Sequence, residues 1–342
     1  MNKDDKILVT GGTGLIGSYL LRKLVDTGFI NLYAINLPNS RFGLVSDIKD
    51  KITWQEADIT NVVELNDVFD GVHTVIHCAG MISLWPKEFK EMYRVNVDGS
   101  ALIVNLCLEH QVNQLVYLSS IEALGREEDN SMISEKTEWK EDINHTKYAS
   151  SKYLGELEAW RGIAEGLDVI IYNPALVLGA GYWDTGPMQL IRDIFNGLKY
   201  YPRGKMAMVD VRDLVKTIVD NLDNEIMFGN RYIVGGHNVS FKHLLHLIAD
   251  KLNVPKPNIA LSGMTAHLAI NIERVRSLFT DSKPLINKES YLITDKELSY
   301  SFDKINAIYQ QQPKDLEESI SDITSVFEST YKVGKGYGVL KN

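Results

Sequence analysis

The stretch Lys6-Ile-Leu-Val-Thr-Gly-Gly-Thr-Gly-Leu-Ile-Gly-Ser-Tyr-Leu-Leu-Arg-Lys-Leu24 decides the fold of this chain. The apolar run over 7–9 is typical of a buried parallel strand. Glycines follow at positions 11, 14 and 17, and apolar residues then recur at helical spacing as far as Leu24. The stretch therefore predicts a strand, a glycine-rich turn and a helix.

This combination favours a site for the pyrophosphate of a dinucleotide. Gly11 allows the tight turn, Gly14 lets the pyrophosphate approach the backbone, and Gly17 lets the helix pack closely on the strand. Free N–H groups and the dipole at the start of the helix stabilise the phosphate charge. The spacing is GxxGxxG rather than the usual GxGxxG, so a tight turn without a ligand is the alternative.

Composition and charge exclude several classes of protein. With 342 residues, 44% hydrophobic and 24% charged, the chain is long enough for one large α/β unit or two domains. A net charge of −9 argues against binding of nucleic acid or of an anionic membrane surface. No apolar run reaches the ~18 residues of a membrane span, and no signal peptide precedes the first strand. With two cysteines and no disulfide framework, we expect a cytoplasmic protein.

Strands and helices alternate along the first half of the chain. Apolar runs predict strands at 32–35, 52–56, 74–77, 115–118 and 169–172, and helical patterns lie after Asn61 and at 93–110 and 147–164. This alternation predicts an α/β fold with a doubly wound parallel sheet, in which ligands bind at the carboxyl ends of the strands. Later helices are expected at 211–222 and 241–252, and the glycine-rich tail 332–342 is expected to be loose.

Three further positions fall at such strand ends. Asp58 follows the third strand, where its carboxylate can accept from an adenine amino group or can close a turn before the next helix. Cys78, Ala79 and Gly80 follow the fourth strand, and their small size lets a cofactor lie close to the chain. We interpret Cys78 as a small hydrophobic residue rather than a nucleophile.

The second strand has no acidic residue at its end to bind a ribose 2′-hydroxyl. Ser40 and Arg41 follow it and can hold a 2′-phosphate, although Arg41 can equally be a solvated loop charge. The cofactor is therefore expected to be NADP(H), with NAD(H) possible.

The candidate catalytic pair is Tyr148 and Lys152, which lie on one face of a predicted helix. A nearby ammonium group lowers the pKa of a phenol, so that Tyr148 can exchange a proton with a substrate oxygen. Ser120, at the end of the fifth strand, can donate a hydrogen bond to the same oxygen. The chain holds six Tyr-x-x-x-Lys matches, but only this one opens a helix after a strand that ends in two serines.

The chain resembles the extended short-chain dehydrogenase/reductases of the NAD-dependent epimerase/dehydratase type. It is most similar to the branch of dihydroflavonol 4-reductases and 3β-hydroxysteroid dehydrogenases. The motifs that carry the resemblance are Thr10-Gly-Gly-Thr-Gly-Leu-Ile-Gly17, Asp58-Ile59, His77-Cys-Ala-Gly80, Asn96-Val-Asp-Gly-Ser100, Tyr117-Leu-Ser-Ser-Ile-Glu-Ala-Leu-Gly125, Tyr148-Ala-Ser-Ser-Lys152, Asn173-Pro-Ala-Leu-Val-Leu-Gly179, Val209-Asp-Val-Arg-Asp-Leu214, Arg231-Tyr-Ile-Val-Gly-Gly236, Pro284-Leu-Ile286, Ser299-Tyr-Ser301 and Pro313-Lys-Asp-Leu-Glu-Glu318.

The resemblance implies residue roles and a domain division. It implies Ser120, Tyr148 and Lys152 as the catalytic triad, with Asn96 as a fourth, supporting position. The implied cofactor contacts are Thr13, Leu15, Ile16, Asp58, Ile59, Ala79 and Pro174, to which we add the neighbouring Asn173, Ala175 and Val177. We expect a dinucleotide-binding domain at 1–175, to which 209–235 returns, and a smaller, mostly helical substrate domain at 176–208 and 236–331.

Two departures from the family pattern bear on the reaction. Ile121 stands where dehydratases of this family have an aspartate, so Glu122 is a candidate base or only a wall of the pocket. The stretch Thr185-Gly-Pro-Met-Gln-Leu190 stands where nucleotide-sugar epimerases usually have an Asn-Asn-Leu-like stretch. Both departures favour a reductase.

An apolar and aromatic substrate pocket is expected, which suits a hydrophobic carbonyl compound. Its candidate residues are Met81, Ser83, Trp85, Glu122, Tyr182, Trp183 and Met188, several of which can instead pack the core of the second domain. His243 and His246 lie one helical turn apart without a carboxylate or cysteine at ligand spacing, so we expect no metal site.

We therefore expect a hydride transfer between a nicotinamide cofactor and a carbonyl or secondary alcohol of a small substrate. An NAD-dependent sugar epimerase, a dehydratase and a redox-sensing binding protein remain as alternatives. By resemblance alone, a homodimer can form through the helices at 93–110 and 147–164.

Overall fold

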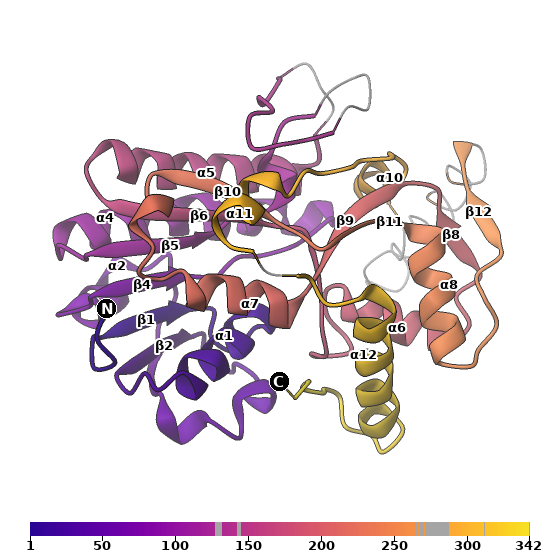
Figure 1. Ribbon diagram of the computed structural model, residues 1–342, viewed down its shortest axis with the longest axis horizontal. Coiled ribbons are helices and arrows are strands. Elements are labelled where there is room, and N and C mark those ends of the chain that lie inside the picture. Colours follow the sequence, from indigo (N-terminus) through magenta and orange to yellow (C-terminus); the bar gives the residue numbers. More distant parts are fainter. Residues whose placement is uncertain are drawn as a thin grey trace.

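The computed structural model of the chain shows two lobes (Figure 1). It describes residues 1–126, 132–141, 145–263, 266, 270, 287–310 and 312–341. The motif Pro284-Leu-Ile286 lies outside the described residues. The larger lobe contains a parallel sheet between layers of helices, and the smaller lobe holds α6, α8, α10 and α12.

The sheet of the larger lobe has seven strands in the order β10-β6-β5-β4-β1-β2-β3, and every neighbouring pair is parallel. This confirms the predicted doubly wound fold. The strands are β1 (Ile7–Thr10), β2 (Leu32–Asn36), β3 (Thr53–Glu56), β4 (Thr74–His77), β5 (Gln114–Leu118), β6 (Asp168–Pro174) and β10 (Asn230–Val234).

Both faces of this sheet are buried, which explains why its central strands are continuous apolar runs. Ile7 and Val9 of β1 belong to one hydrophobic core, whereas Leu8 between them belongs to the other. On the first face, α1 (Leu15–Asp26) packs beside α7 (Val211–Asp220). On the second, α4 (Gly99–Glu109) packs beside α5 (Lys147–Ala164).

The helix expected at 93–110 is interrupted. It consists of α3 (Phe89–Tyr93), a π-helical turn at Arg94–Asp98, and α4. A short α2 (Val62–Leu65) follows β3. The 3-10 turns of the described residues are Gly43–Val45, Lys49–Lys51, Asn66–Phe69, Pro86–Glu88, Ile121–Ala123 and Glu225–Met227.

The smaller lobe combines helices with two small sheets. One sheet has the order β11-β9-β7, from β7 (Leu176–Leu178), β9 (Lys205–Asp210) and β11 (His237–Ser240), and the other pairs β8 (Tyr200–Pro202) with β12 (Ile259–Leu261). The helices are α6 (Met188–Phe195), α8 (Phe241–Lys251), α10 (Lys288–Thr294), α11 (Asp303–Ile308) and α12 (Leu316–Tyr331). β9 extends to Asp210, and α7 then packs beside α1 on the larger lobe, while the expected domain division stays a prediction.

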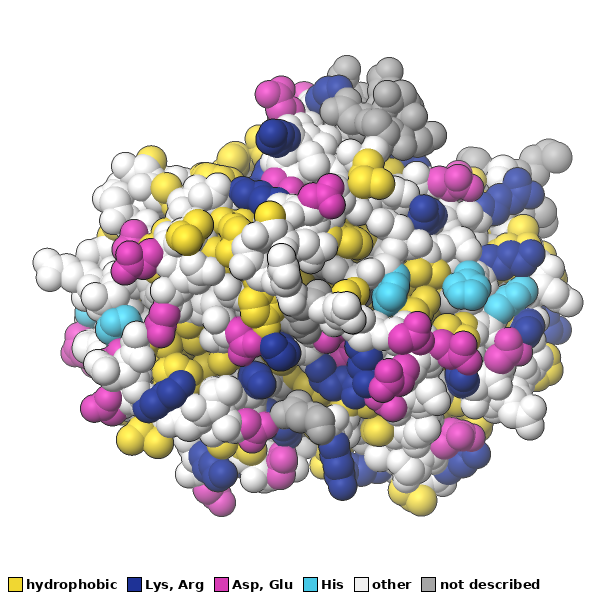
Figure 2. All heavy atoms as spheres, viewed as in Figure 1, with side chains coloured by type: hydrophobic (Ala, Val, Ile, Leu, Met, Phe, Trp, Pro, Cys, Tyr) yellow, Lys and Arg dark blue, Asp and Glu magenta, His cyan; other side chains and the backbone are white. Residues whose placement is uncertain are grey.

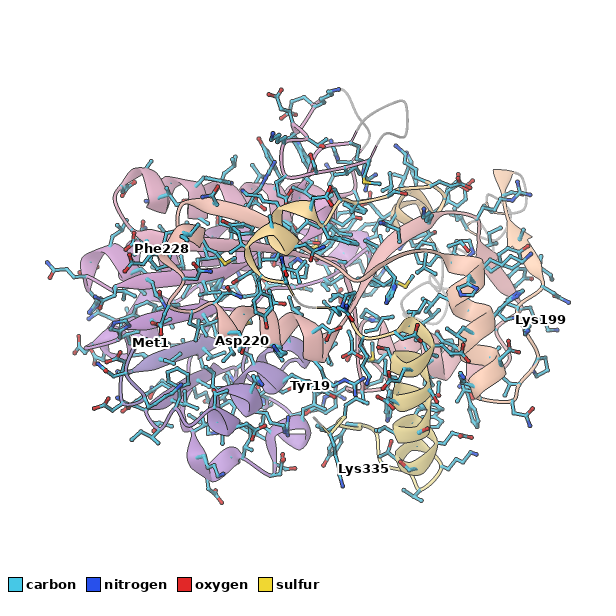
Figure 3. All side chains as sticks on the ribbon, in the orientation of Figure 1. Met1, Tyr19, Lys199, Asp220, Phe228 and Lys335 are labelled. Atoms are coloured by element: carbon cyan, nitrogen blue, oxygen red, sulfur yellow. The ribbon has the colours of Figure 1, made fainter. Side chains whose placement is uncertain are left out.

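The expectation of a loose tail is wrong for residues 337–340, which are partly or fully buried. The N–H of Leu340 donates to the hydroxyl of Tyr19 at 2.7 Å, and Leu340 is only 2% exposed. A Cβ on Gly338 would lie 2.8 Å from the Trp183 ring. The tail glycines therefore allow close packing on α1 and α12, between the labelled Tyr19 and Lys335 (Figure 3).

Among the described residues, no helix is long and apolar enough to cross a membrane. On the face in Figure 2, basic and acidic side chains are interspersed. Leu154 and Leu157 of α5 are 38% and 42% exposed, beside α4. These leucines fit the helix pair expected to form a dimer, which stays a prediction.

Candidate active site

The turn between β1 and α1 leaves no room for side chains. Gly11 has a φ of +68°, and a Cβ there would lie 2.8 Å from the backbone nitrogen of Ala79. A Cβ on Gly17 would lie 2.3 Å from the Gly11 carbonyl oxygen. Gly14 precedes α1 without a side-chain cap, so the first N–H groups of the helix stay available for an anion. This cradle fits the pyrophosphate of a dinucleotide.

Thr13 in this turn and Leu15 and Ile16 in the first turn of α1 remain partly exposed. Beside it, the N–H of Ala79 donates to the Thr10 hydroxyl at 3.1 Å, and this hydroxyl is 2.8 Å from Nδ1 of His77. These bonds hold the segment after β4 against the turn, as close approach of a cofactor requires.

Burial determines the protonation of His77, the last residue of β4, and of Cys78, which follows it. It raises the pKa of the Cys78 thiol to about 12 and lowers the pKa of His77 to about 3. Cys78 is therefore a thiol at neutral pH, as its interpretation as a small hydrophobic residue requires, and His77 is uncharged.

Asp58 closes a turn. Its Oδ1 accepts from the N–H and the hydroxyl of Thr60 at 2.9 and 2.8 Å, and its Oδ2 pairs with Arg94 at 3.1 Å. Burial opposes ionisation, but these hydrogen bonds and Arg94 lower the pKa of Asp58. The side chain of Asp58 is still 29% exposed, so a contact with adenine stays a prediction. Ile59 is buried and lies under Gly99.

Arg41 follows β2 together with the partly exposed Ser40. Its Nη1 donates to both carboxylate oxygens of Asp184, at 3.0 and 2.9 Å, and its guanidinium lies 3.9 Å from the ring centre of Tyr182. The Tyr182 hydroxyl donates to the Arg41 carbonyl at 2.5 Å. Tyr182 therefore packs against the segment that follows β2, and its assignment to the substrate pocket is corrected.

The catalytic candidates meet where β5 ends and α5 begins. Thr146 caps α5 by accepting from the N–H of Ala149 at 3.0 Å, which fixes Tyr148 in the first turn of the helix. The Tyr148 phenol forms a hydrogen bond with the Ser120 side chain. Lys152, one turn later and 7% exposed, donates from Nζ to the Leu118 carbonyl at 2.9 Å.

In the chain alone, the pKa of Tyr148 is not lowered to the neutral range as expected from Lys152. Burial raises the pKa of Tyr148 to about 12, although the Ser120 hydrogen bond acts in the opposite direction. Burial also lowers the pKa of Lys152 to about 8, against the attraction of Glu156. Because burial outweighs the Ser120 hydrogen bond, Tyr148 stays a protonated phenol at neutral pH and can act as a proton donor.

Asn96 lies within the π-helical turn and is 3% exposed. Its Oδ1 accepts from the Met81 N–H at 2.8 Å, and its Nδ2 donates to the Met81 carbonyl and the Ser151 hydroxyl, both at 2.9 Å. A Cβ on Gly80 would lie 3.3 Å from Asn96 Oδ1 and 3.9 Å from Lys152 Nζ. Asn96 thus joins the segment after β4 to α5, and such π-turns are frequent at functional sites.

A buried carboxylate that the sequence analysis missed supports this arrangement. Glu156, 1% exposed, accepts from the Ser119 hydroxyl at 2.5 Å and from Asn173 Nδ2 at 2.6 Å, and it pairs with Arg231 at 3.1 Å. Asn173 also donates to the Ser120 carbonyl at 3.0 Å. Asn173 therefore positions the end of β5. Its neighbours Pro174, Ala175 and Val177 are buried or nearly so around the end of β6.

The model of the NAD-dependent epimerase/dehydratase family matches residues 7–235. The chain belongs to this family. A putative dihydroflavonol 4-reductase of Synechocystis sp. is 28% identical over 260 residues, which cover 74% of each of the two chains.

Solved structures share the fold of this family member. The crystal structure of gox2253 superposes with a TM-score of 0.81 at 25% identity, over 95% of this chain and 98% of that one. A dTDP-glucose 4,6-dehydratase of Bacillus anthracis, in complex with NAD, gives a TM-score of 0.74 at 19% identity over 96% and 98%. The chain is accordingly an NAD(P)-dependent oxidoreductase of the extended short-chain dehydrogenase/reductase type.

In this family member the smaller lobe approaches the catalytic residues through α10. Asn287 donates from Nδ2 to the Leu84 carbonyl at 2.7 Å, and Glu289 accepts from the N–H of Lys147 at 2.6 Å. The first contact fixes the segment that carries Met81, Ser83 and Trp85, in which the buried Ser83 hydroxyl donates to Glu88 at 2.6 Å. The second fixes the start of α5.

Two residues assigned to the pocket pack the core of the smaller lobe instead. Trp183 and Met188 are 1% and 2% exposed. The Trp183 indole donates to the Thr330 hydroxyl at 3.1 Å and contacts the Phe327 ring edge-on. We therefore leave both out of the proposed pocket.

Glu122 is paired rather than free. Its Oε2 lies 2.8 Å from Nη2 of Arg126, and both side chains are at most 5% exposed.

In the described part of the chain, no group of three or more histidine, cysteine and carboxylate side chains could hold a metal ion. Histidines gather near α8 (Figure 2), where Nε2 of His246 bonds the Pro257 carbonyl.

Proposed function

We propose that the protein transfers a hydride between NADP(H) and a carbonyl or secondary alcohol, and that it acts as a reductase on a small, partly apolar carbonyl compound. The observation that carries this proposal is the hydrogen-bonded pair of hydroxyls, Ser120 and Tyr148, at the carboxyl edge of the sheet, with the Lys152 ammonium buried behind them. The similarity to a putative dihydroflavonol 4-reductase supports reduction over epimerisation.

Each residue has a defined part in this reaction. The Tyr148 phenol gives its proton to the carbonyl oxygen, and the Ser120 hydroxyl donates a hydrogen bond to the same oxygen. The charged Lys152 stabilises the phenolate that remains. Asn96 holds the Met81 backbone at the edge of the pocket. A bound nicotinamide supplies the hydride.

Replacement of Tyr148 tests the reaction. Tyr148→Phe removes the proton donor but keeps the ring, so the rate of carbonyl reduction is expected to fall by about 10²- to 10⁴-fold. Cofactor binding, measured by the quenching of protein fluorescence, should stay within about two-fold. Tyr153→Phe, on the same helix and stacked on Trp139, is the matched control and should keep full activity.

Two outcomes contradict the proposal. A Tyr148→Phe protein that keeps its rate places the proton donor elsewhere. A wild-type protein that retains bound NAD through purification, and interconverts sugar epimers, supports the epimerase instead.

The cofactor preference rests on Arg41. Because Asp184 holds its guanidinium, a 2′-phosphate must share or displace that carboxylate. Arg41→Gln should weaken NADPH binding about ten-fold and leave NADH within about two-fold, and Asp184→Asn should strengthen NADPH binding. Calorimetric titration with both cofactors measures this, and equal losses for NADPH and NADH rule out a phosphate role for Arg41.

A further inference from the structure

A buried ion pair lies directly beside the proposed proton donors. Glu122 and Arg126 are 5% and 3% exposed and are 2.8 Å apart. The N–H of Glu122 donates to the Ser120 Oγ at 3.1 Å, so the pair begins two residues after a candidate catalytic hydroxyl. A buried pair is stable only when its remaining donors and acceptors are also satisfied.

In this pair they are not. The contact uses one oxygen of Glu122 and one nitrogen of Arg126, and the buried Oε1 of Glu122 and Nη1 of Arg126 have no hydrogen-bond partner. Guanidinium groups can bind in a bidentate way, so a single contact leaves an N–H group open. Folded proteins leave few such groups, so an open one beside an active site calls for an explanation, of which ligand binding is one.

A second positive charge of the described residues lies near this pair. Burial is the main cause that lowers the pKa of Lys296, in the smaller lobe. Lys296 also lies close enough to the pair for Arg126 to lower its pKa further and for Glu122 to raise it. The described residues give its ammonium no hydrogen bond or ion pair. Tyr300 and His145 also lie near Arg126, and both are uncharged because burial raises the pKa of Tyr300 and lowers that of His145, on which the Glu141 carboxylate acts as well. Among the described residues, Arg126 and Lys296 therefore share the Glu122 carboxylate, and Glu141 acts on His145 beside them.

We propose that Arg126 and Lys296 bind a carboxylate group of the substrate, from the larger and the smaller lobe respectively. Glu122 holds the guanidinium through Nη2, which leaves Nη1 to donate to the ligand. The carboxylate balances the extra charge and supplies the missing acceptor. The inference rests on the proposed function for the reacting carbonyl. It narrows the substrate class to oxo acids or the corresponding hydroxy acids.

The test compares an acid with its neutral ester. The probes are 4-oxo-4-phenylbutanoate and its methyl ester, each reduced with NADPH. The wild-type protein should have the higher kcat/KM for the acid. Arg126→Gln and Lys296→Gln should each lower this value for the acid about ten-fold or more, and change it for the ester by less than about three-fold. Lys242→Gln, at an exposed position on α8, is the control and should change neither.

A second readout separates this inference from the proposed function. Protection against thermal unfolding by each probe, with NADPH present, reports binding without turnover. If neither probe is reduced but the acid protects the wild type and not the two variants, the carboxylate site stands and the reductase proposal fails. Equal protection by acid and ester, or variants that bind the acid as the wild type does, overturns the inference. Should Arg126→Gln not fold, Lys296→Gln decides, because Lys296 is outside the buried pair.

Discussion

Burial sets the charge states of the two side chains at the centre of the site. It raises the pKa of Tyr148 to about 12 and lowers that of Lys152 to about 8. In the reduction direction Tyr148 must be protonated, a condition that holds throughout the physiological range. Lys152 must be charged to stabilise the phenolate, and this condition is lost as the pH rises through about 8. The ammonium group, not the phenol, therefore limits the reaction at high pH.

A pH profile tests this conclusion. The kcat/KM for carbonyl reduction should be constant at about pH 6–7 and fall about ten-fold per pH unit above pH 8. In Lys152→Arg the guanidinium stays charged, so the fall should disappear even if the plateau is lower. A Lys152→Arg profile with the same fall near pH 8 would assign that titration to another group.

Single residues differ in how well the sequence identifies them. Ser120, Tyr148 and Lys152 could be assigned because each has a local context, a strand end or the first turns of a helix. Glu156 and Lys296 could not, because their surroundings come from segments far apart in the chain. Trp183 and Tyr182 were misplaced for the same reason, since their partners Thr330 and Arg41 are also distant.

At the scale of elements, the position of α5 against the π-helical turn controls the geometry of the site. A Cβ on Gly155 would lie 2.2 Å from the Asn96 carbonyl oxygen and 2.7 Å from the Tyr117 hydroxyl. The missing side chain lets α5, with Tyr148 and Lys152, approach the turn that carries Asn96. The close contact of these helices is therefore part of the catalytic arrangement.

Gly155→Ala should push these two elements apart. We expect the free energy of unfolding to fall by about 2–3 kcal/mol, despite the better helix propensity of alanine, and the rate of reduction to fall at least about ten-fold. Gly162→Ala on the same helix is the control, because its Cβ would meet only side chains, the nearest at 3.1 Å. Urea unfolding and steady-state rates measure both effects. Equal results for the two variants would contradict a special role for Gly155.

The central strands of the larger lobe were predictable because β1, β4 and β5 are buried on both faces and are rich in apolar residues. The strands β7, β8 and β12 were not, because each has three residues and too little pattern. The π-helical turn has no sequence pattern of its own, since it arises where the helix adapts to Met81 and Ser151.

At the scale of the whole molecule, the C-terminal tail connects the lobes near the end of β2. The backbone N–H of Trp183 donates to the Gly336 carbonyl at 3.1 Å. Tyr337 forms an antiparallel β-bridge with Tyr182, whose hydroxyl donates to the Arg41 carbonyl. Glycine content alone predicted a loose segment here. The contacts that order it, with Tyr19 on α1 above all, depend on the folded arrangement of distant elements.

Removal of residues 336–342 should therefore affect stability and cofactor binding but not chemistry. Loss of the buried Leu340 and its neighbours is expected to lower the free energy of unfolding by about 2–4 kcal/mol. Because Tyr182 then loses the support of Tyr337, the dissociation constant for NADPH should rise about five-fold or more. The kcat at saturating NADPH should stay within about two-fold, since the contacts of the described tail residues are with Tyr19, Tyr182 and Trp183 and not with the catalytic candidates. Val333→Ala, at a position that is 76% exposed, is the control. A truncated protein that binds NADPH normally but has a lower kcat would contradict this prediction, because the tail would then act on the catalytic residues and not on Arg41.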